Sequence, residues 1–163
     1  MCSSDLLTLL AGLRAVGAPP LVVRVGTAAT VLAGAVFAVL QGVDGIALKH
    51  AVDSLATAPP ALRDAYFHDV EIVRWGEWAM ASYAQLTLGL AVAVVGIAVL
   101  GSRALPRWTA ALALLAGAAF AVNGALVGYV GFSDQVVASL VGWISLALFA
   151  LATTAAAWTR ARG

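Results

Sequence analysis

The chain has 163 residues, of which 63% are hydrophobic and only 10% are charged, and its formal net charge at pH 7 is +1. So few charges leave little room for a soluble fold, and a nucleic-acid-binding role would need a clustered basic face. The single cysteine, Cys2, excludes an intrachain disulfide and the thiol relays of some membrane enzymes. The length is that of one domain.

The N-terminal segment has two parts. Residues 1–6, Met-Cys-Ser-Ser-Asp-Leu, resemble a sequencing-library adapter translated from a GTG start, which predicts a metagenomic origin and a native N-terminus further upstream. The stretch that follows has no basic n-region and contains Arg14 and the Pro19-Pro20 pair, so it is not typical of a secretory signal. We expect residues 1–20 to form a short amphipathic lead-in that lies on the membrane.

Four apolar runs follow, at residues 21–43, 77–100, 106–129 and 132–158, with a short tail at 159–163. About 20 apolar residues at ~1.5 Å rise per residue cross the hydrocarbon core of a bilayer, so each run predicts a transmembrane helix. The predicted fold class is an all-α membrane protein, an up-down bundle of four transmembrane helices. A partly helical outer loop, residues 44–76, joins the first two spans.

The basic residues are distributed unevenly between the two sides of these spans. Six of the nine occur around the start of span 1, in the second connection and in the tail: Arg14, Arg24, Arg103, Arg107, Arg160 and Arg162. Only Lys49, Arg63 and Arg74 occur in the long first connection. The positive-inside rule therefore predicts cytoplasmic termini and an outer loop on the far side. Because lysine is nearly absent and Ala, Gly, Val and Arg abound, we expect a bacterial inner (plasma) membrane.

Small residues recur at regular spacing in two spans. In span 1 they occur every fourth position, at Gly26, Thr30, Gly34, Ala38 and Gly42, and in span 3 Gly117, Gly124 and Gly131 follow at intervals of seven. Such stripes let helix backbones approach closely in lipid. They favour packing within the bundle, with dimerisation as the alternative.

The outer loop has helical composition on both sides of Pro59-Pro60. No helix breaker follows between Ala61 and Gly76, so we expect the second loop helix to continue directly into span 2. One helix face then carries a charged, aromatic and amide-bearing stripe that includes Asp64, His68, Glu71, Trp75, Trp78, Ser82, Gln85 and Gly89.

Polar side chains gather in the outer half of the predicted spans. Because polar groups at membrane depth face protein or water, we expect a small pocket open to the outside. The pocket candidates are Gln41, Glu77, Ser82, Gln85, Asn123, Tyr129 and Trp143. The alternative is that Gln85 and Asn123 hydrogen-bond each other across two helices. Arg74 and Glu77, one turn apart, are expected to form an ion pair at the membrane boundary.

Two histidines and three carboxylates in the outer loop form a possible ligand set for Zn²⁺ or another first-row ion: His50, Asp53, Asp64, His68 and Glu71. The alternative is a solvated loop. No other cofactor is predicted, since the spans contain no histidine for haem and the chain has no glycine-rich phosphate loop. No serine within the spans has a histidine at its depth, which argues against a hydrolase.

Three segments, Arg74–Gly101, Pro106–Trp108 and Gly128–Ser133, resemble uncharacterised bacterial membrane proteins known only as domains of unknown function. The resemblance is a pattern of tryptophans, glycines and helix boundaries. It implies a four-span inner-membrane protein and no particular activity, and it assigns no functional residue.

These observations leave three hypotheses. The first is a non-catalytic accessory or small-molecule-binding protein that uses the outward-facing pocket. The second is a small oligomeric transporter subunit, and the third is a metal-dependent activity in the outer loop. The expected partners are the lipid bilayer and either further copies of the chain or another membrane protein.

Overall fold

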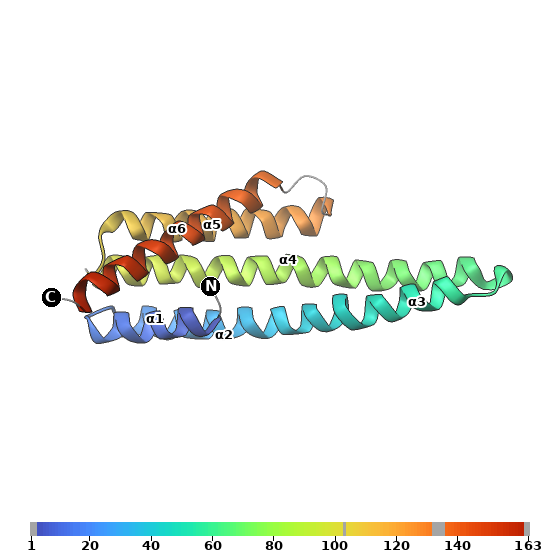
Figure 1. Cartoon of the computed structure of the whole chain (residues 1–163), viewed down its shortest axis with the longest axis horizontal. Coiled ribbons are helices and arrows are strands. Elements are labelled where there is room, and N and C mark those ends of the chain that lie inside the picture. The colour runs from blue at the N-terminus through green and yellow to red at the C-terminus, as the bar shows by residue number, and fades with distance from the viewer. Residues whose placement is uncertain (1–2, 103, 132–135, 162–163) are drawn as a thin grey trace.

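The computed structural model describes residues 3–102, 104–131 and 136–161, and every regular element in them is helical (Figure 1). The α-helices are α1 (Ser3–Ala15), α2 (Pro20–Gly42), α3 (Lys49–Thr57), α4 (Arg63–Ser102), α5 (Arg107–Val130) and α6 (Val136–Ala161), joined in part by the π-helical η1 (Val43–Leu48) and the 3₁₀-helical η2 (Pro60–Leu62). The all-helical part of the predicted fold class is confirmed. Four helical segments are long and apolar enough to cross a membrane, as the four runs predicted.

The first of these segments is longer than the sequence indicated. Helix α2, η1 and α3 follow one another without a break from Pro20 to Thr57, whereas span 1 was expected to end at Val43. No proline occurs between Pro20 and Pro59, so nothing terminates the helix at the end of the apolar run. Helix α4 confirms the other expectation, because it runs for 40 residues from Arg63 directly through span 2.

Helix α4 is the central element, with α2 on one side and α5 on the other, both antiparallel to it (Figure 1). The start of α2 lies beside the end of α4, where a Cβ added to Gly101 would approach Pro19 Cδ to 2.6 Å. Helix α6 packs on α5. There Phe120 and Trp143 meet edge to face, with ring centroids 5.1 Å apart.

The α4–α5 contact is a close approach of two backbones. A Cβ on Gly89 would lie 2.6 Å from the carbonyl oxygen of Gly117, and a Cβ on Gly117 would lie 2.7 Å from that of Gly89. Near the other end of this contact the Ser82 hydroxyl donates to the carbonyl oxygen of Gly124 at 2.8 Å. The small residues of the third run therefore serve packing within one chain, the use that the sequence favoured.

Helix α1 does not form a surface lead-in as expected. Leu6, Leu10 and Leu13 are at most 3% exposed and belong to the same core as Val95 and Phe149. The three leucines share one helix face, and Gly26 of α2 leaves room for them, because a Cβ there would meet Leu10 at 3.0 Å. Residues 3–6 form the first turn of this helix, so part of the adapter-like segment takes part in the fold.

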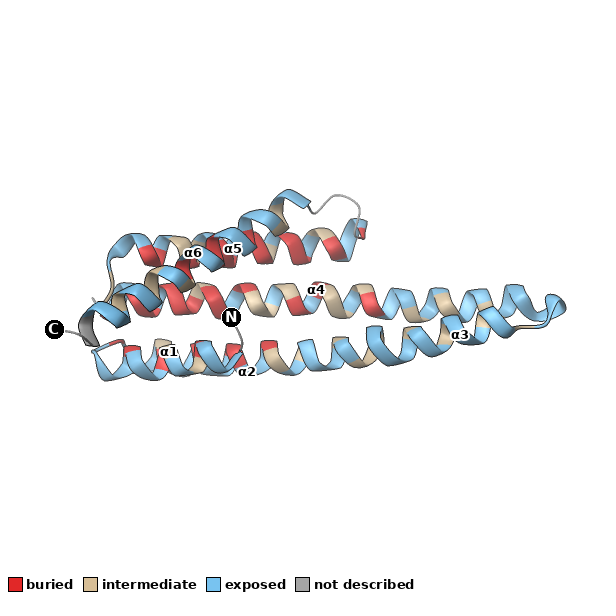
Figure 2. Cartoon of the chain, in the orientation of Figure 1, coloured by how far each residue is buried: buried red, intermediate tan, exposed pale blue. Residues whose placement is uncertain are grey.

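Helix α5 ends well before the hairpin of α3 and α4 does (Figure 1). Gly131, its C-cap residue, has φ 72°, and a Cβ there would contact the Trp78 ring of α4 at 3.1 Å. From Trp78 to Arg63, α4 continues for 15 residues, about 22 Å. We call residues 43–77 the stalk. It is largely exposed (Figure 2), and η1, α3 and η2 contain no buried residue.

Candidate functional site

A cavity of about 240 Å³ lies among α1, α2, α4 and α6. It exceeds an engineered apolar cavity of ~150 Å³ in another protein that holds benzene. Its wall consists of Ser3 and Leu6 of α1, Thr30, Ala33, Phe37 and Leu40 of α2, Ala81, Ala84, Gln85 and Leu88 of α4, and Trp143 of α6. The space is therefore large enough for a small organic molecule.

The wall of the cavity is mostly aliphatic and aromatic, with an amide among its few polar groups. The Thr30 hydroxyl is already used, because it donates to the carbonyl oxygen of Gly26 at 2.8 Å. The Gln85 Oε1 atom is buried and has no hydrogen-bond partner among the residues that the structure describes. An unsatisfied buried acceptor costs about 1–3 kcal/mol, so a rotation of the amide that brought Oε1 to a donor of a bound molecule would be stabilising.

Two of the seven predicted pocket residues, Gln85 and Trp143, line this cavity. Gln41 is exposed on α2 and Tyr129 is 92% exposed on α5, so neither encloses a pocket. Ser82 is turned to α5, where it bonds Gly124. A helix at the edge of a bundle buries only one face, and the position of a residue along the predicted span does not show whether it lies on that face.

Asn123 is 2% exposed on α5, and within the described part of the chain its Oδ1 atom has no hydrogen-bond partner. The alternative in which Gln85 and Asn123 bond each other is therefore wrong, because the oxygen of each amide is without a partner. Asn123 is buried and Gln85 is partly buried, but α4 and α5 do not bring the two amides into hydrogen-bond contact.

The predicted ion pair is present where the cavity-lining face of α4 reaches the stalk. Arg74 Nη1 donates to Glu77 Oε2 at 2.8 Å, and Glu77 is only 7% exposed. Ala81 and Ala84 follow Glu77 by four and seven residues, so the three lie on one helix face. A buried carboxylate requires such a partner, and Arg74 supplies it.

The walls contributed by α1 and α2 were missed. For α1 a signal existed, since Leu6, Leu10 and Leu13 are spaced at four and three residues. For α2, Thr30, Ala33 and Phe37 also follow helical spacing, but a lipid-facing stripe has the same appearance. An apolar helix face indicates that the face avoids water. It does not indicate whether the face contacts lipid or lines a cavity in the protein.

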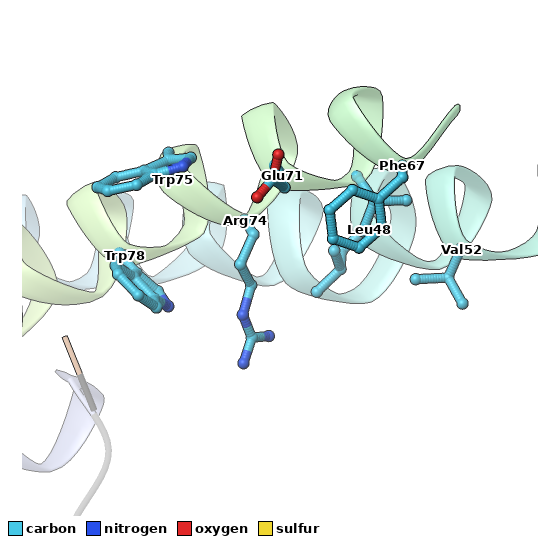
Figure 3. A pocket seen from close by; sticks show the side chains of 8 residues that line it. Leu48, Val52, Phe67, Glu71, Arg74, Trp75 and Trp78 are labelled. Atoms are coloured by element: carbon cyan, nitrogen blue, oxygen red, sulfur yellow. The ribbon is translucent and has the colours of Figure 1, made fainter. Parts of the chain in front are cut away.

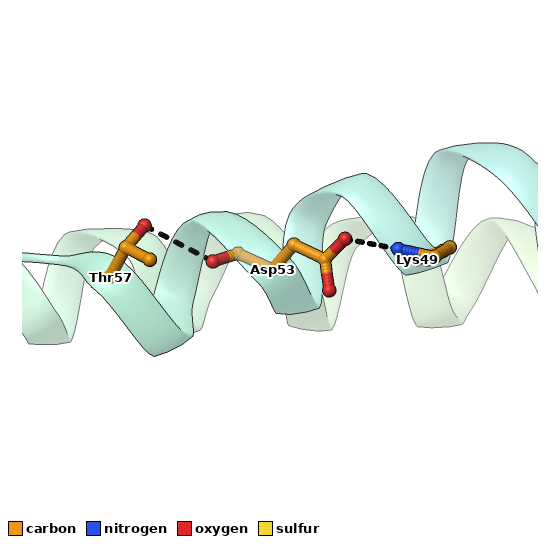
Figure 4. Close-up of polar contacts among 3 residues, drawn as sticks. All are labelled: Lys49, Asp53 and Thr57. Atoms are coloured by element: carbon orange, nitrogen blue, oxygen red, sulfur yellow. Dashed lines mark hydrogen bonds and ion pairs between the residues drawn. The ribbon is translucent and has the colours of Figure 1, made fainter.

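The five predicted metal ligands do not gather into a site. Asp53 pairs with Lys49, and Thr57 donates to the Asp53 carbonyl oxygen at 3.2 Å (Figure 4). His68 Nδ1 lies 3.0 Å from Glu71 Oε2 on the next turn of α4. His50 and Asp64 are exposed. Within residues 3–102, 104–131 and 136–161, no three His, Cys, Asp or Glu residues are arranged to hold a metal ion.

A second hollow, of about 390 Å³, lies on the stalk between α3 and α4 (Figure 3). We call it the stalk groove and define it by its lining residues: Leu48, Val52, Phe67, Val70, Glu71, Arg74, Trp75 and Trp78. Trp75 and Trp78 lie together at the end of the groove nearer α5, with ring centroids 5.3 Å apart. This groove is open to the surroundings, whereas the cavity between the long helices is more enclosed.

Comparison with known proteins adds no family or fold relative: no protein-family model, curated protein sequence or solved structure matches this chain.

Proposed function

We propose that this chain is a multi-pass membrane protein that binds a small, largely apolar molecule in the cavity of about 240 Å³. The observation that carries the proposal is Gln85, which lines a mostly apolar wall and whose buried Oε1 atom has no hydrogen-bond partner among the described residues. Small-molecule sites combine such apolar walls with few polar groups that set orientation. The ligand class is accordingly an apolar ring or chain that carries one hydrogen-bond donor.

The distribution of charge supports an orientation with both termini in the cytoplasm of a bacterial inner membrane. Arg14, Arg24 and Arg107 lie at the ends of α1, α2 and α5 that are remote from the stalk. In this arrangement the four long helices cross the bilayer in up-down order and the stalk projects outside. The ion pair of Arg74 and Glu77 then lies at the outer boundary.

Two ligands that differ by one donor test the proposal: 1-naphthol, which has a hydroxyl, and naphthalene, which lacks it. A ligand that binds only the folded state raises the midpoint of thermal unfolding. For detergent-solubilised protein, we expect 1-naphthol to raise the midpoint in the parent. In Gln85→Leu its affinity should be about tenfold weaker, the equivalent of ~1.4 kcal/mol. Naphthalene should bind both proteins equally.

Two further variants complete the design. Gln41→Leu makes the same chemical change on α2 at an exposed position outside the cavity, and it should leave 1-naphthol binding unchanged. Ala81→Leu extends a side chain from the cavity wall and should abolish binding of both ligands. Equal affinity of 1-naphthol for the parent and Gln85→Leu, or undiminished binding to Ala81→Leu, would contradict the proposed site.

A further inference from the structure

The stalk exposes apolar side chains in a region that is otherwise rich in charge. Val52, Phe67 and Trp75 of the stalk groove are 46%, 51% and 67% exposed. We propose that the groove receives an amphipathic helix of a partner protein, which has an apolar face flanked by basic residues. This interaction is separate from ligand binding in the cavity between the long helices.

The stalk has little core of its own. No residue of η1, α3 or η2 is buried, so α3 and α4 cover each other only in part. Short helices in water derive most of their stability from packing of an apolar face. An exposed groove lined mainly by apolar side chains is typical of a surface that binds another molecule.

The groove continues an interface that already exists. Below Trp78, the face of α4 that includes Ser82 and Gly89 is covered by α5. Glu71 and Phe67 precede Trp78 by seven and eleven residues, so they lie on that same face further out. Helix α5 stops at Gly131, against the Trp78 ring. A partner helix in the stalk groove would therefore continue the line of α5 along the same face of α4, past the point where α5 ends.

The charge of the stalk favours a basic partner over a second copy. The stalk carries six acidic and three basic residues, a formal net charge of −3 at pH 7. Two of its three bases are used internally, Lys49 by Asp53 and Arg74 by Glu77. Glu71 lines the groove, and Asp64, seven residues earlier, lies on the same face of α4. Among the described residues, no ion pair joins either carboxylate to a lysine or arginine. A second stalk would oppose this charge with the same charge, whereas lysine or arginine would complement it.

Two peptides test the inference. Both are about 18 residues long, five helical turns, with leucine on one face. One carries lysine on its remaining positions and the other carries glutamate. Binding to the full chain in nanodiscs of zwitterionic lipid is followed by fluorescence anisotropy, with empty nanodiscs subtracted. We expect the lysine peptide to bind and the glutamate peptide to bind at least tenfold more weakly.

Matched variants locate the interaction on the groove. Glu71→Lys should weaken the lysine peptide about fivefold, because it places a like charge beside the peptide. Asp69→Lys makes the same charge change two positions away, on a different face of α4, and should have little effect. Similarly, Phe67→Ala should weaken binding, and Ile72→Ala, which truncates an apolar side chain 69% exposed outside the groove, should not.

A photoreactive residue in place of Val52 distinguishes the possible occupants. Cross-linking to the lysine peptide, lost in Phe67→Ala, would support the inference. Cross-linked dimers of the chain as the main product would overturn it in favour of a second copy, and adducts of lipid alone would overturn it in favour of the membrane. Equal binding of the two peptides, or equal effects of Glu71→Lys and Asp69→Lys, would also overturn it.

Discussion

Two glycines of α4, Gly89 and Gly76, have different surroundings. At Gly89 the absence of a Cβ lets the backbone of α5 pack closely: an added Cβ would lie only 2.6 Å from the Gly117 carbonyl oxygen. At Gly76 on the same helix, an added Cβ would have no neighbour within 4 Å. In lipid, where burial of apolar surface drives little association, such close backbone contact is a main source of helix affinity.

Alanine substitution should therefore have opposite effects at these two glycines. Gly89→Ala forces α4 and α5 apart and should lower the free energy of unfolding by about 1–3 kcal/mol. Gly76→Ala meets nothing and should raise it by about 0.5–1 kcal/mol, because alanine favours the helix more than glycine does. Unfolding in mixed micelles of increasing denaturing detergent measures both. Equal effects of the two substitutions would mean that the α4–α5 contact is looser than described.

Two polar side chains of α4, the buried Ser82 and the partly buried Gln85, should also respond differently to removal. Ser82→Ala deletes a hydrogen bond to α5 and should lower the free energy of unfolding by about 0.6 kcal/mol. Gln85→Leu removes an acceptor that has no partner, so without ligand it should be neutral or stabilising by up to about 1 kcal/mol. The same detergent titration serves for both variants. A clear loss of stability in Gln85→Leu would reveal a partner for that amide.

At the scale of elements, α1 has the role least expected from its sequence. It lies antiparallel to α2 and contributes Leu6, Leu10 and Leu13 to the core shared with α4, α5 and α6. It also forms one wall of the cavity. A 13-residue helix is too short to cross a bilayer, and burial of its leucines against the longer helices holds it in place.

Truncation of the most buried of these leucines should test that role. Leu10 is 0% exposed, so Leu10→Ala should leave a void and lower the free energy of unfolding by about 2–4 kcal/mol. Leu21→Ala, at a position 72% exposed at the start of α2, removes the same atoms and should change it by less than about 0.5 kcal/mol. If α1 instead lay on the membrane, the two substitutions would have similarly small effects.

At the scale of the whole molecule, the stalk gives the two ends of the structure different characters. One end carries the exposed α3–α4 hairpin, and at the other end the start of α2 lies beside the end of α4 (Figure 1). Impermeant thiol labelling tests which end is outside. With Cys2 replaced by serine, a cysteine at Ala58 should react in intact cells, and one at Val16, which is 51% exposed, should react only after permeabilisation. The reverse pattern would invert the proposed orientation.

The sequence by itself determined the helical class, the four long apolar helices, the break at Pro59-Pro60 and the continuation of the loop helix into span 2. These features follow from local rules, because a helix begins and ends where its own residues permit. The Arg74–Glu77 pair is likewise a matter of spacing along one helix.

Only the tertiary structure decided which faces meet. Lipid and protein interior are equally apolar, so hydropathy could not say that Leu10 is buried, that Tyr129 is exposed, or that Gln85 lines a cavity while Gln41 does not. Nor could spacing within the loop place His50 relative to His68, because that distance depends on how α3 and α4 pack across the turn. Contacts between two helices depend on how the side chains of both helices fit together, so the sequence of one helix does not determine them.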